Sequence, residues 1–325
     1  MNLPTLTVVV PNFNHARALP ACLRALLAQS VPALEVIVID DASTDDSVSV
    51  IEDFARRHPS IRVLRQETNR GVVAGMNRGL ELARGDFVLF AAADDEVLPG
   101  LFEKSLNLLA QHPGAGLCCA IGDWRQPERG LRWHMGVGMA GTRCFLPPAA
   151  VAGLERAGRL FIASHTVLFH RERLLAAGGF PPELKWHCDW FAMHVLAFRH
   201  GLCHVPEPLG ILNIRGASYH EHGRRNAAEY RELLGRLLDR LASESCADVR
   251  APIRDSGALF LFGWPMLRLV VSDPRGREFL TPRLARRCVW HAVRLVAKRF
   301  TPAWLGNLYF RLAGYHVPQT GAPPR

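Results

Sequence analysis

Short runs of apolar residues, each bounded by polar ones, punctuate the first hundred residues of the chain. The clearest run extends from Phe87 to Ala93 and ends in three consecutive acids, Asp94-Asp95-Glu96. A short run that is apolar throughout is typical of a strand buried on both faces of a parallel sheet. Two earlier runs, Leu6–Val10 and Glu35–Asp40, are rich in β-branched residues and predict buried strands of the same kind.

Stretches with helical periodicity separate these strands. One predicted helix ends near Gln29, and Ser43 or Thr44 is expected to cap the next one. A short strand is predicted at Ile61–Leu64. The second helix has Val48, Ile51, Phe54 and Ala55 on one side, and the third contains Val73, Met76, Asn77 and Leu80. Strands that alternate with helices over short links predict an α/β fold with right-handed crossovers and a mainly parallel, Rossmann-like sheet.

The pattern is less regular after this unit. Further strands are predicted at Leu117–Ile121, Ser164–His170 and Gly201–Leu209, and a short helix at Arg171–Ala177. Residues 122–148 show little periodicity. Their polar and aromatic side chains either line a pocket or belong to a plain surface excursion: Asp123, Trp124, Arg125, Trp133 and His134. After Arg224 the pattern is helical, with a leucine stripe from Leu233 to Leu241.

Composition narrows the class of protein. The 325 residues are 49% hydrophobic and 21% charged, as in a globular protein. No apolar run approaches the roughly 20 residues that span a bilayer. The first five residues do not resemble a signal peptide, and the eight cysteines form no C-x-x-C pair, so we expect a cytoplasmic, reduced protein. No G-x-G-x-x-G follows any of the predicted strands, and no P-loop sequence is present, which argues against a dinucleotide cofactor and an ATP-hydrolysing P-loop.

Acidic residues follow two of the predicted strands. Asp40-Asp41 and Asp94-Asp95 are expected side by side at one edge of the sheet, where open α/β sheets bind ligands. Carboxylates there suit a hard divalent cation, and such a cation suits a phosphate-bearing substrate. The alternative is that Asp94-Asp95-Glu96 opens the next helix, where acids are favoured by the helix dipole.

Several segments together resemble the family 2 glycosyltransferases of the GT-A fold. The order and spacing of the segments match over about the first hundred residues, and weaker matches continue to about Ser218. The matching segments are Val8-Val9-Val10-Pro11-Asn12-Phe13-Asn14, Val38-Ile39-Asp40-Asp41-Ala42-Ser43-Thr44-Asp45, Asn69-Arg70-Gly71, and Gly85-Asp86 through Asp94-Asp95. The resemblance implies a GT-A domain over residues 1–222, with a donor half (1–122) and an acceptor half (123–222), and then a helical region over 223–325.

By this resemblance, the chain would bind a nucleoside-diphosphate sugar. The residues implied in donor binding are Pro11, Asn12, Asn14, Asp40, Ser43, Asn69, Gly71, Asn77 and Asp94. Asp94 and Asp95 correspond to the D-x-D region that binds Mn²⁺ or Mg²⁺, which would neutralise the departing diphosphate. The chain departs from the family pattern at Ala92, where an acid is usual, and at Met76, where an arginine often precedes Asn77.

A second group of residues matches the acceptor side of the family. Gly178-Gly179-Phe180 precedes Asp189, the position of the family's general base, while Cys188 replaces the common glutamate. The alternative for Asp189 is an ordinary acid in the first turn of a helix. Arg215 and His220 are candidates for a loop that closes over the diphosphate. A zinc site formed by His187, Cys188, Cys203 and His204 is disfavoured relative to core thiols, because the spacing matches no standard site.

The resemblance implies inverting transfer of a sugar to an acceptor hydroxyl in bacterial-type surface glycan or polysaccharide synthesis, with Asp189 taking the proton. Two alternatives stay open: a nucleotide-sugar-binding protein without turnover, and a nucleotidyltransferase, although Pro11-Asn12-Phe13-Asn14-His15 is not a basic triphosphate loop. We expect a glycan or lipid-linked acceptor and no nucleic-acid partner. A homodimer contact through the helical region is a further option.

The net charge of +9 is concentrated near the end of the sequence. The segment from Thr281 to Arg325 has no acid and contains Arg283, Arg286, Arg287, Arg294, Lys298, Arg299, Arg311 and Arg325. Within 283–300, arginines alternate with Leu284, Val289, Trp290, Val293, Leu295 and Val296. Such a helix either docks on the inner face of the plasma membrane or packs its apolar side on the domain.

Overall fold

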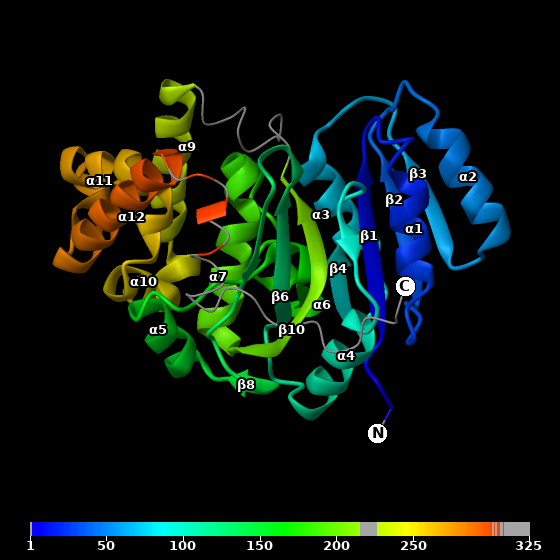
Figure 1. Cartoon of the computed structure of the whole chain (residues 1–325), viewed down its shortest axis with the longest axis horizontal. Helices are drawn as coiled ribbons and strands as arrows, with labels where there is room; N and C mark the ends of the chain where they lie inside the picture. Colours follow the sequence, from blue (N-terminus) through cyan, green and yellow to red (C-terminus); the bar gives the residue numbers. More distant parts are fainter. Residues whose placement is uncertain (1, 215–225, 301, 303, 306–307, 309–325) are drawn as a thin grey trace.

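A twisted sheet runs through the middle of the molecule, with helices on both of its faces (Figure 1). The computed structural model describes residues 2–214, 226–300, 302, 304, 305 and 308. The sheet order is β3-β2-β1-β4-β9-β6-β10-β5, with β7 beside β6 and β8 beside β10. Four helices from the last third of the chain gather at one end, away from β3.

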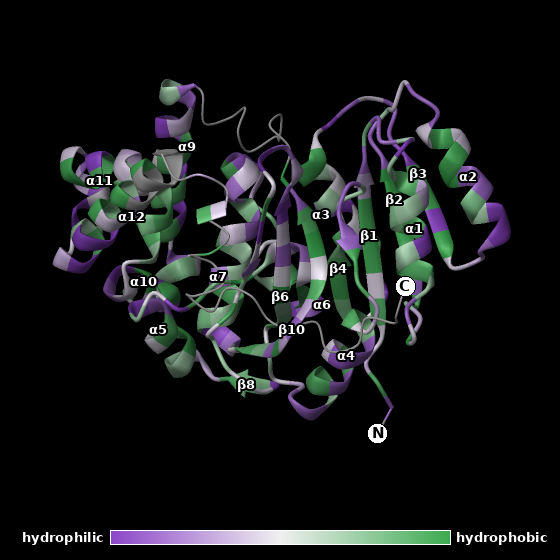
Figure 2. Ribbon diagram, viewed as in Figure 1, coloured by the Kyte–Doolittle hydropathy of each residue, from purple (hydrophilic) through white to green (hydrophobic). Residues whose placement is uncertain are grey.

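The first four strands form the parallel part of the sheet. They are β1 (Leu6–Asn12), β2 (Glu35–Asp40), β3 (Ile61–Arg65) and β4 (Phe87–Phe90). The crossover helices are α1 (Leu19–Leu27), α2 (Ser47–Arg57) and α3 (Val72–Leu82). Every residue of β2 is buried, as its unbroken apolar pattern predicts. Figure 2 shows how hydrophobic residues concentrate in these central strands. The predicted α/β class with βαβ crossovers is confirmed.

The second part of the sheet is mixed. Its long strands β6 (Leu117–Gln126) and β10 (Leu202–Asn213) are parallel to each other. The antiparallel strands β9 (Leu168–His170), β7 (Leu131–Met135), β8 (Cys144–Leu146) and β5 (Glu96–Val97) complete it. Helices α4 (Leu101–Gln111), α5 (Pro148–Arg156), α6 (Arg171–Ala176) and α7 (Cys188–His200) connect these strands. Because β6 extends to Gln126, the expected division at residue 122 falls inside a strand.

Three local predictions differ from the structure. Strand β4 ends at Phe90, so Ala91–Ala93 lie in a turn although they are apolar. Helix α4 begins at Leu101, so Asp94-Asp95-Glu96 does not open it and the helix-dipole alternative was wrong. The segment 122–148 is not a plain excursion, because β6 and β7 form a hairpin that pairs Asp123 with His134 and Trp124 with Trp133.

The last third of the described chain is helical, as the periodicity after Arg224 predicts. Its main helices are α9 (Ala227–Ala242), α10 (Ala247–Ser256), α11 (Gly263–Ser272) and α12 (Pro282–Phe300). The leucine stripe of α9, from Leu233 to Leu241, is buried in the same core cluster as residues of α7 and α10. No helix among the described residues is long and apolar enough to cross a membrane.

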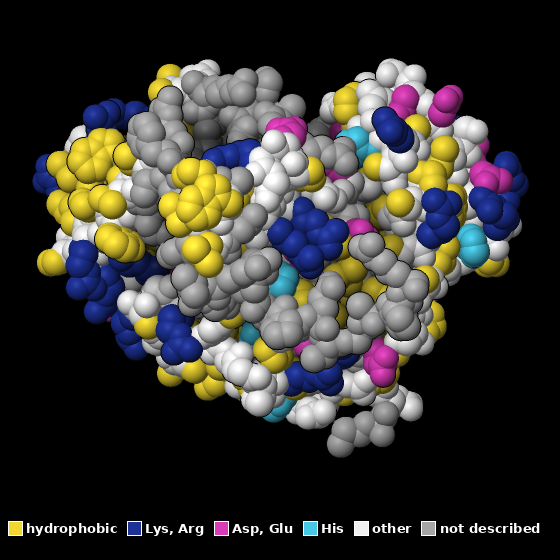
Figure 3. Space-filling view, in the orientation of Figure 1, with side chains coloured by type: hydrophobic (Ala, Val, Ile, Leu, Met, Phe, Trp, Pro, Cys, Tyr) yellow, Lys and Arg dark blue, Asp and Glu magenta, His cyan; other side chains and the backbone are white. Residues whose placement is uncertain are grey.

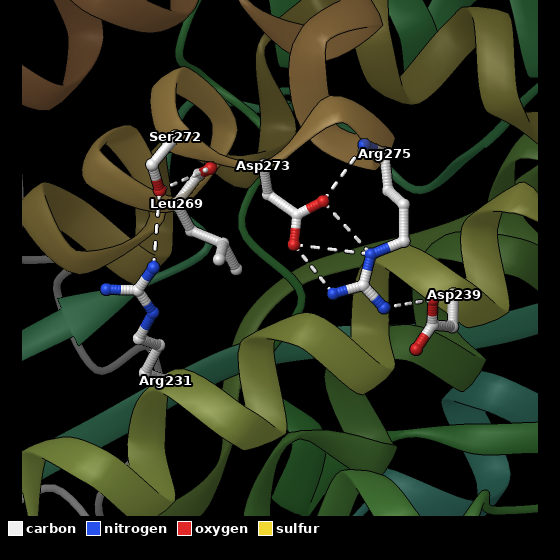
Figure 4. Close-up of polar contacts among 6 residues, drawn as sticks. All are labelled: Arg231, Asp239, Leu269, Ser272, Asp273 and Arg275. Atoms are coloured by element: carbon white, nitrogen blue, oxygen red, sulfur yellow. Dashed lines mark hydrogen bonds and ion pairs between the residues drawn. The ribbon is translucent and has the colours of Figure 1, made fainter.

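A charged network joins these helices at the surface (Figure 4). The guanidinium of Arg275 lies between Asp239 and Asp273, with nitrogen–oxygen distances of 2.6 Å to each. Arg231 donates to the hydroxyl of Ser272 at 3.3 Å. A hollow of about 510 Å³ beside this network is lined by charges of both signs. Its lining residues come from α9, α11 and residues 273–275. These helices lie at the far end of the molecule from β2 and β3 (Figure 1).

Candidate active site

The carboxyl ends of β1, β2 and β4 meet at one edge of the sheet. Strand β1 lies between the other two, so the expectation that the Asp40 and Asp94 strands are direct neighbours was wrong. The register places Asn12 of β1 opposite Asp40 of β2. On the other side, the amide of Ala91 donates to Val9 O at 2.9 Å, so the turn that carries Asp94 and Asp95 starts beside β1.

A buried hydrogen-bond network joins the ends of β1 and β2. Asn12 and Asp40 are each 2% exposed. The Asn12 Nδ2 donates to Asp40 Oδ1 at 2.8 Å and to Ser43 Oγ at 3.1 Å. The Ser43 hydroxyl donates to Asp40 Oδ1 at 2.6 Å. Among the described residues, the buried Asn12 Oδ1 has no partner, which leaves an acceptor at this edge of the sheet.

Ser43 therefore does not cap a helix. Helix α2 begins at Ser47, its N-cap residue Asp46 makes no side-chain capping hydrogen bond, and Ser47 N donates instead to Asp45 Oδ1 at 2.9 Å. Thr44 does not cap it either, since the amide of Thr44 donates to Asn14 Oδ1 at 2.8 Å. The capping prediction was wrong because both hydroxyl residues are held by the loop after β1.

Two residues with left-handed backbones shape these loops. Asn14 has φ 57° and Ala42 has φ 60°. Asparagine tolerates this region, whereas an alanine there is uncommon and costs backbone energy. The surrounding hydrogen bonds keep both loops in place: Asn14 N donates to Ser43 Oγ at 3.0 Å, and Ala16 N donates to Asp45 Oδ2 at 3.0 Å.

Asp41 organises the third loop of the site, a role that the sequence pattern did not assign. It is 5% exposed and accepts hydrogen bonds from Arg70 N at 2.7 Å and Gly71 N at 2.8 Å. Gly71 N also lies 3.1 Å from Asn69 Oδ1. The predicted residues Asn69 and Gly71 are thereby fixed to the end of β2. The sequence signal that could have indicated this role of Asp41 is its position as the second of two consecutive acids after a buried strand.

The Asp94-Asp95 turn lies between β4 and β5, and both acids are partly exposed. Asp95 N donates to Ala92 O at 3.2 Å, and Asn213 Nδ2 lies 3.4 Å from Asp94 O. Burial, together with the negative charges of Asp95 and Asp94, raises the pKa of the Cys22 thiol to about 12. A cation at this turn would meet two partly exposed carboxylates.

These carboxylates fit part of a metal site. Among the described residues, no group of three or more His, Cys, Asp or Glu side chains could hold a metal ion. Two oxygen ligands from the protein leave positions for phosphate oxygens and water, as Mg²⁺ sites on phosphate substrates usually require. The zinc candidates, which come from the start of α7, the residue before it and β10, form no such group either, and Cys188, Cys203, His187 and His204 are all buried.

Asp189 lies in the first turn of α7. Its carboxyl is only partly exposed, and loss of solvent raises its pKa above the ordinary value. Hydrogen bonds from Trp190 N, at 2.6 Å to Oδ1, and from the Ser164 hydroxyl oppose that rise. A carboxyl in such surroundings can accept a proton more readily than an exposed aspartate.

Both polar atoms of the Asn77 side-chain amide form hydrogen bonds with the Gly178-Gly179-Phe180 turn. Its Nδ2 donates to Phe180 O at 2.8 Å, and its Oδ1 accepts from Phe180 N at 2.9 Å. In this structure Asn77 therefore ties α3 to the segment that leads to Asp189, apart from the Asn12–Asp40 network. Arg215 and His220 lie outside the described residues.

The family model "Glycosyl transferase family 2" matches residues 7–174 of the chain. The chain belongs to this family. The matched region contains the loops after β1 and β2 and the Asp94-Asp95 turn, and Asp189 lies beyond it. The chain is also 37% identical over 129 residues to the uncharacterized glycosyltransferase YibD of Escherichia coli (strain K12), a match covering 40% of this chain and 37% of the relative. That match thus spans well under half of the relative's length.

Two solved structures of proteins bound to nucleotide sugars share the fold. TarS 1-349 of S. aureus, in complex with UDP-GlcNAc, superposes with a TM-score of 0.61 at 18% identity, over 85% of this chain and 79% of that one. The mannosyltransferase PcManGT from Pyrobaculum calidifontis, in complex with GDP-Man and Mn²⁺, superposes with a TM-score of 0.60 at 19% identity. This match covers 97% of this chain and 87% of that one. The family 2 chain therefore has the predicted GT-A fold.

Proposed function

We propose that this family 2 chain transfers a sugar from a nucleoside-diphosphate sugar to an acceptor hydroxyl, with inversion at the anomeric carbon. One observation carries the proposal. The Asn12–Asp40–Ser43 network and the Asp94-Asp95 turn flank the carboxyl end of the same strand, β1. Open α/β sheets bind ligands at that edge. In this proposal residues 1–122 bind the donor and residues 123–222 the acceptor.

The nucleoside would bind at the ends of β1 and β2. Asn12 Oδ1 is a buried acceptor without a partner among the described residues, which is costly unless a ligand donates to it. The ring N–H beside a carbonyl in uracil, thymine or guanine is such a donor, and this supports a sugar nucleotide carrying one of these bases. Asp40 and Ser43 hold the Asn12 amide in one orientation, because both lie within hydrogen-bonding distance of its Nδ2. Pro11, Asn14, Asn69 and Gly71 would line the same side.

The diphosphate would lie toward the Asp94-Asp95 turn. These two carboxylates would hold Mn²⁺ or Mg²⁺, which when bound supplies Lewis-acid stabilisation of the leaving diphosphate. Ala92 is exposed and occupies the position of the usual third acid, so the chain itself supplies fewer ligands than the family pattern. The PcManGT complex with GDP-Man and Mn²⁺ supports a divalent ion in this fold.

Asp189 would be the general base. Its carboxylate accepts hydrogen bonds from Trp190 N, at Oδ1, and from the Ser164 hydroxyl, and a remaining lone pair would accept the hydroxyl proton of the acceptor. As that proton leaves, the acceptor oxygen forms a bond to the anomeric carbon and the bond from that carbon to the diphosphate oxygen breaks. The displacement is a single step, so no sugar bound covalently to the protein is needed. Asn77 would act indirectly, by tying α3 to the Phe180 turn.

The acceptor would be a glycan or a lipid-linked saccharide, handled on the cytoplasmic side during surface glycan synthesis. Incubation of the protein with a panel of nucleoside-diphosphate sugars, Mn²⁺ and saccharide acceptors, read out as released nucleoside diphosphate, tests the activity. Release of nucleoside diphosphate from one of the donors supports the transferase activity if that release depends on Asp189.

The second candidate is a binding protein without turnover, which the missing acid at Ala92 favours. Tight binding of a nucleoside diphosphate with no release from any donor would select that candidate.

A further inference from the structure

Helix α12 is apolar on two opposite sides. Leu284 and Cys288 are 1% and 0% exposed and pack inward. Val289, Trp290, Val293 and Val296 point outward, with exposed fractions of 53%, 64%, 51% and 60%. Several of the apolar residues within 283–300 therefore do share one side of the helix, while Leu284 lies on the other. One apolar side suffices to pack a helix on a domain, so the outward side needs another explanation.

The orientation of α12 is fixed by a buried ion pair. Arg287 Nη1 lies 2.8 Å from Glu155 Oε1 on α5 and donates to Ser256 O at 2.8 Å. The Arg287 guanidinium also stacks on Phe260, with its carbon 3.7 Å from the ring centroid. Turning the helix to bury Trp290 would break all three contacts and leave the Glu155 carboxylate buried without its partner, at a high cost.

Helix α11 packs beside α12 and continues the apolar surface. Trp264 and Val271 of α11 are 48% and 56% exposed, and Arg268 lies over the Trp264 ring at 5.7 Å. Beyond α12, Trp304, Leu305 and Leu308 are exposed as well. Figure 3 shows hydrophobic side chains gathered at this end of the molecule, with basic side chains around them. We call this surface, formed by Trp264, Val271, Val289, Trp290, Val293 and Val296, the α11–α12 face.

Charge indicates the kind of partner. Arg286 is exposed on the outward side of α12, and Arg268 is exposed on α11. The sequence from Thr281 to Arg325 contains eight basic residues and no acid. Tryptophan and arginine beside exposed aliphatic residues suit the interface of an anionic lipid layer. There the rings and methyl groups enter the headgroup region and the guanidinium groups meet phosphate.

We propose that the α11–α12 face docks on an anionic phospholipid membrane. The apolar side chains insert at the interface, and the arginines are drawn to negatively charged headgroups. This proposal does not rest on the transfer reaction, and it holds whether or not the donor site is active. A partner protein or nucleic acid is a poorer fit: the surface is rich in aliphatic side chains, and basic residues surround it.

The test is co-sedimentation of the full chain with vesicles of phosphatidylcholine alone or mixed with phosphatidylglycerol. We expect binding only to the mixed vesicles, and its loss at about 0.5 M salt, where the Debye length falls to roughly 4 Å. The double substitution Trp290→Ser with Val293→Ser, and separately Arg286→Glu, should each weaken partitioning about tenfold or more. Both sites are exposed, so the variants should fold.

Matched controls come from the other end of the molecule. Leu34→Ser removes a side chain that is 46% exposed before β2, and Arg24→Glu reverses an exposed charge on α1. Both should bind vesicles like the parent. Failure of the parent to sediment at low salt would overturn the proposal, as would equal binding by the α12 variants. Self-association that Trp290→Ser abolishes, without vesicle binding, would assign the face to a second copy of the chain instead.

Discussion

The Asn12 Nδ2 atom lies 2.8 Å from Asp40 Oδ1, across two neighbouring parallel strands. Both residues are almost completely buried, yet Asn12 Oδ1 has no partner among the described residues. The hydrogen bond to Asp40 fixes the orientation of the Asn12 amide. The same amide keeps a buried oxygen, Oδ1, that can still accept a hydrogen bond.

Asn12→Ala should weaken binding of the cognate nucleoside diphosphate by about tenfold or more, because it removes the hydrogen bond to the base. It should also lower the free energy of unfolding by about 1–3 kcal/mol, since Asp40 loses a buried partner. Isothermal calorimetry and chemical denaturation measure the two effects. The control is Asn107→Ala, an exposed asparagine on α4. Unchanged affinity in Asn12→Ala would remove this residue from the donor site.

Asp95→Ala should abolish the enhancement of nucleoside-diphosphate binding by Mn²⁺ and leave the melting temperature without ligand nearly unchanged. One remaining carboxylate, Asp94, holds the ion poorly, and both acids are partly exposed. Calorimetry with and without Mn²⁺ measures the difference. A variant that keeps full Mn²⁺ dependence would show that these acids are not ligands. Asp53→Ala, an exposed acid of α2, is the control.

Ala92→Asp should strengthen the binding of Mn²⁺ in the presence of nucleoside diphosphate. Ala92 is exposed, so an added carboxylate fits without repacking and supplies the acid that the family pattern places there. The apparent Mn²⁺ affinity, measured by titration, should rise severalfold. No change, or weaker binding, would mean that this position faces away from the ion.

Asp189→Asn should lower the rate of transfer by about 10²–10⁴ while donor affinity is kept, because the amide cannot accept the proton. In the parent, the raised pKa of Asp189 predicts that kcat falls as pH drops through that pKa and the carboxylate becomes protonated. The same substitution should raise the melting temperature slightly at neutral pH, since burial penalises the charged form. A variant that transfers sugar at the parent rate would move the base elsewhere.

Arg287→Ala should destabilise the chain by about 3–5 kcal/mol, because it leaves Glu155 buried with only the neutral His194 beside it, 4.0 Å away. Burial lowers the pKa of Arg287 and raises that of Glu155, so for both groups loss of solvent outweighs the attraction of the pair. The double variant Arg287→Met with Glu155→Leu should recover most of the loss. Urea denaturation measures both. A mild effect of the single variant would show that α12 is held mainly by Leu284 and Cys288.

Much of the fold follows from local pattern. The bounds of β2 match the prediction residue for residue, because Val36–Ile39 are β-branched and Asp40 ends the run at a polar edge. Strand β4 was predicted three residues too long, since Ala91–Ala93 are apolar but lie in a turn. Alanine has little strand preference, and a run of apolar residues does not reveal where pairing stops.

Other features depend on contacts that no local pattern contains. The place of β1 between β2 and β4 is a property of the whole sheet. The hairpin of β6 and β7 was missed because its polar residue Asp123 is buried and neutralised by Arg125 and Arg132. Asp41 and Asn77 have structural partners at Gly71 and Phe180 that are distant in sequence. In the same way, only the structure shows that α12 exposes Trp290 while burying Leu284.

Thermal stability in the presence of a panel of nucleoside diphosphates, each with and without Mn²⁺, tests the proposed donor site most directly. The nucleoside diphosphate with the matching base should stabilise the protein by about 2.7 kcal/mol when its concentration is a hundredfold its dissociation constant. The stabilisation should require Mn²⁺, and it should be lost in both Asn12→Ala and Asp95→Ala. If no nucleoside diphosphate stabilises the parent under either condition, or if both variants respond like the parent, the account of the site is wrong.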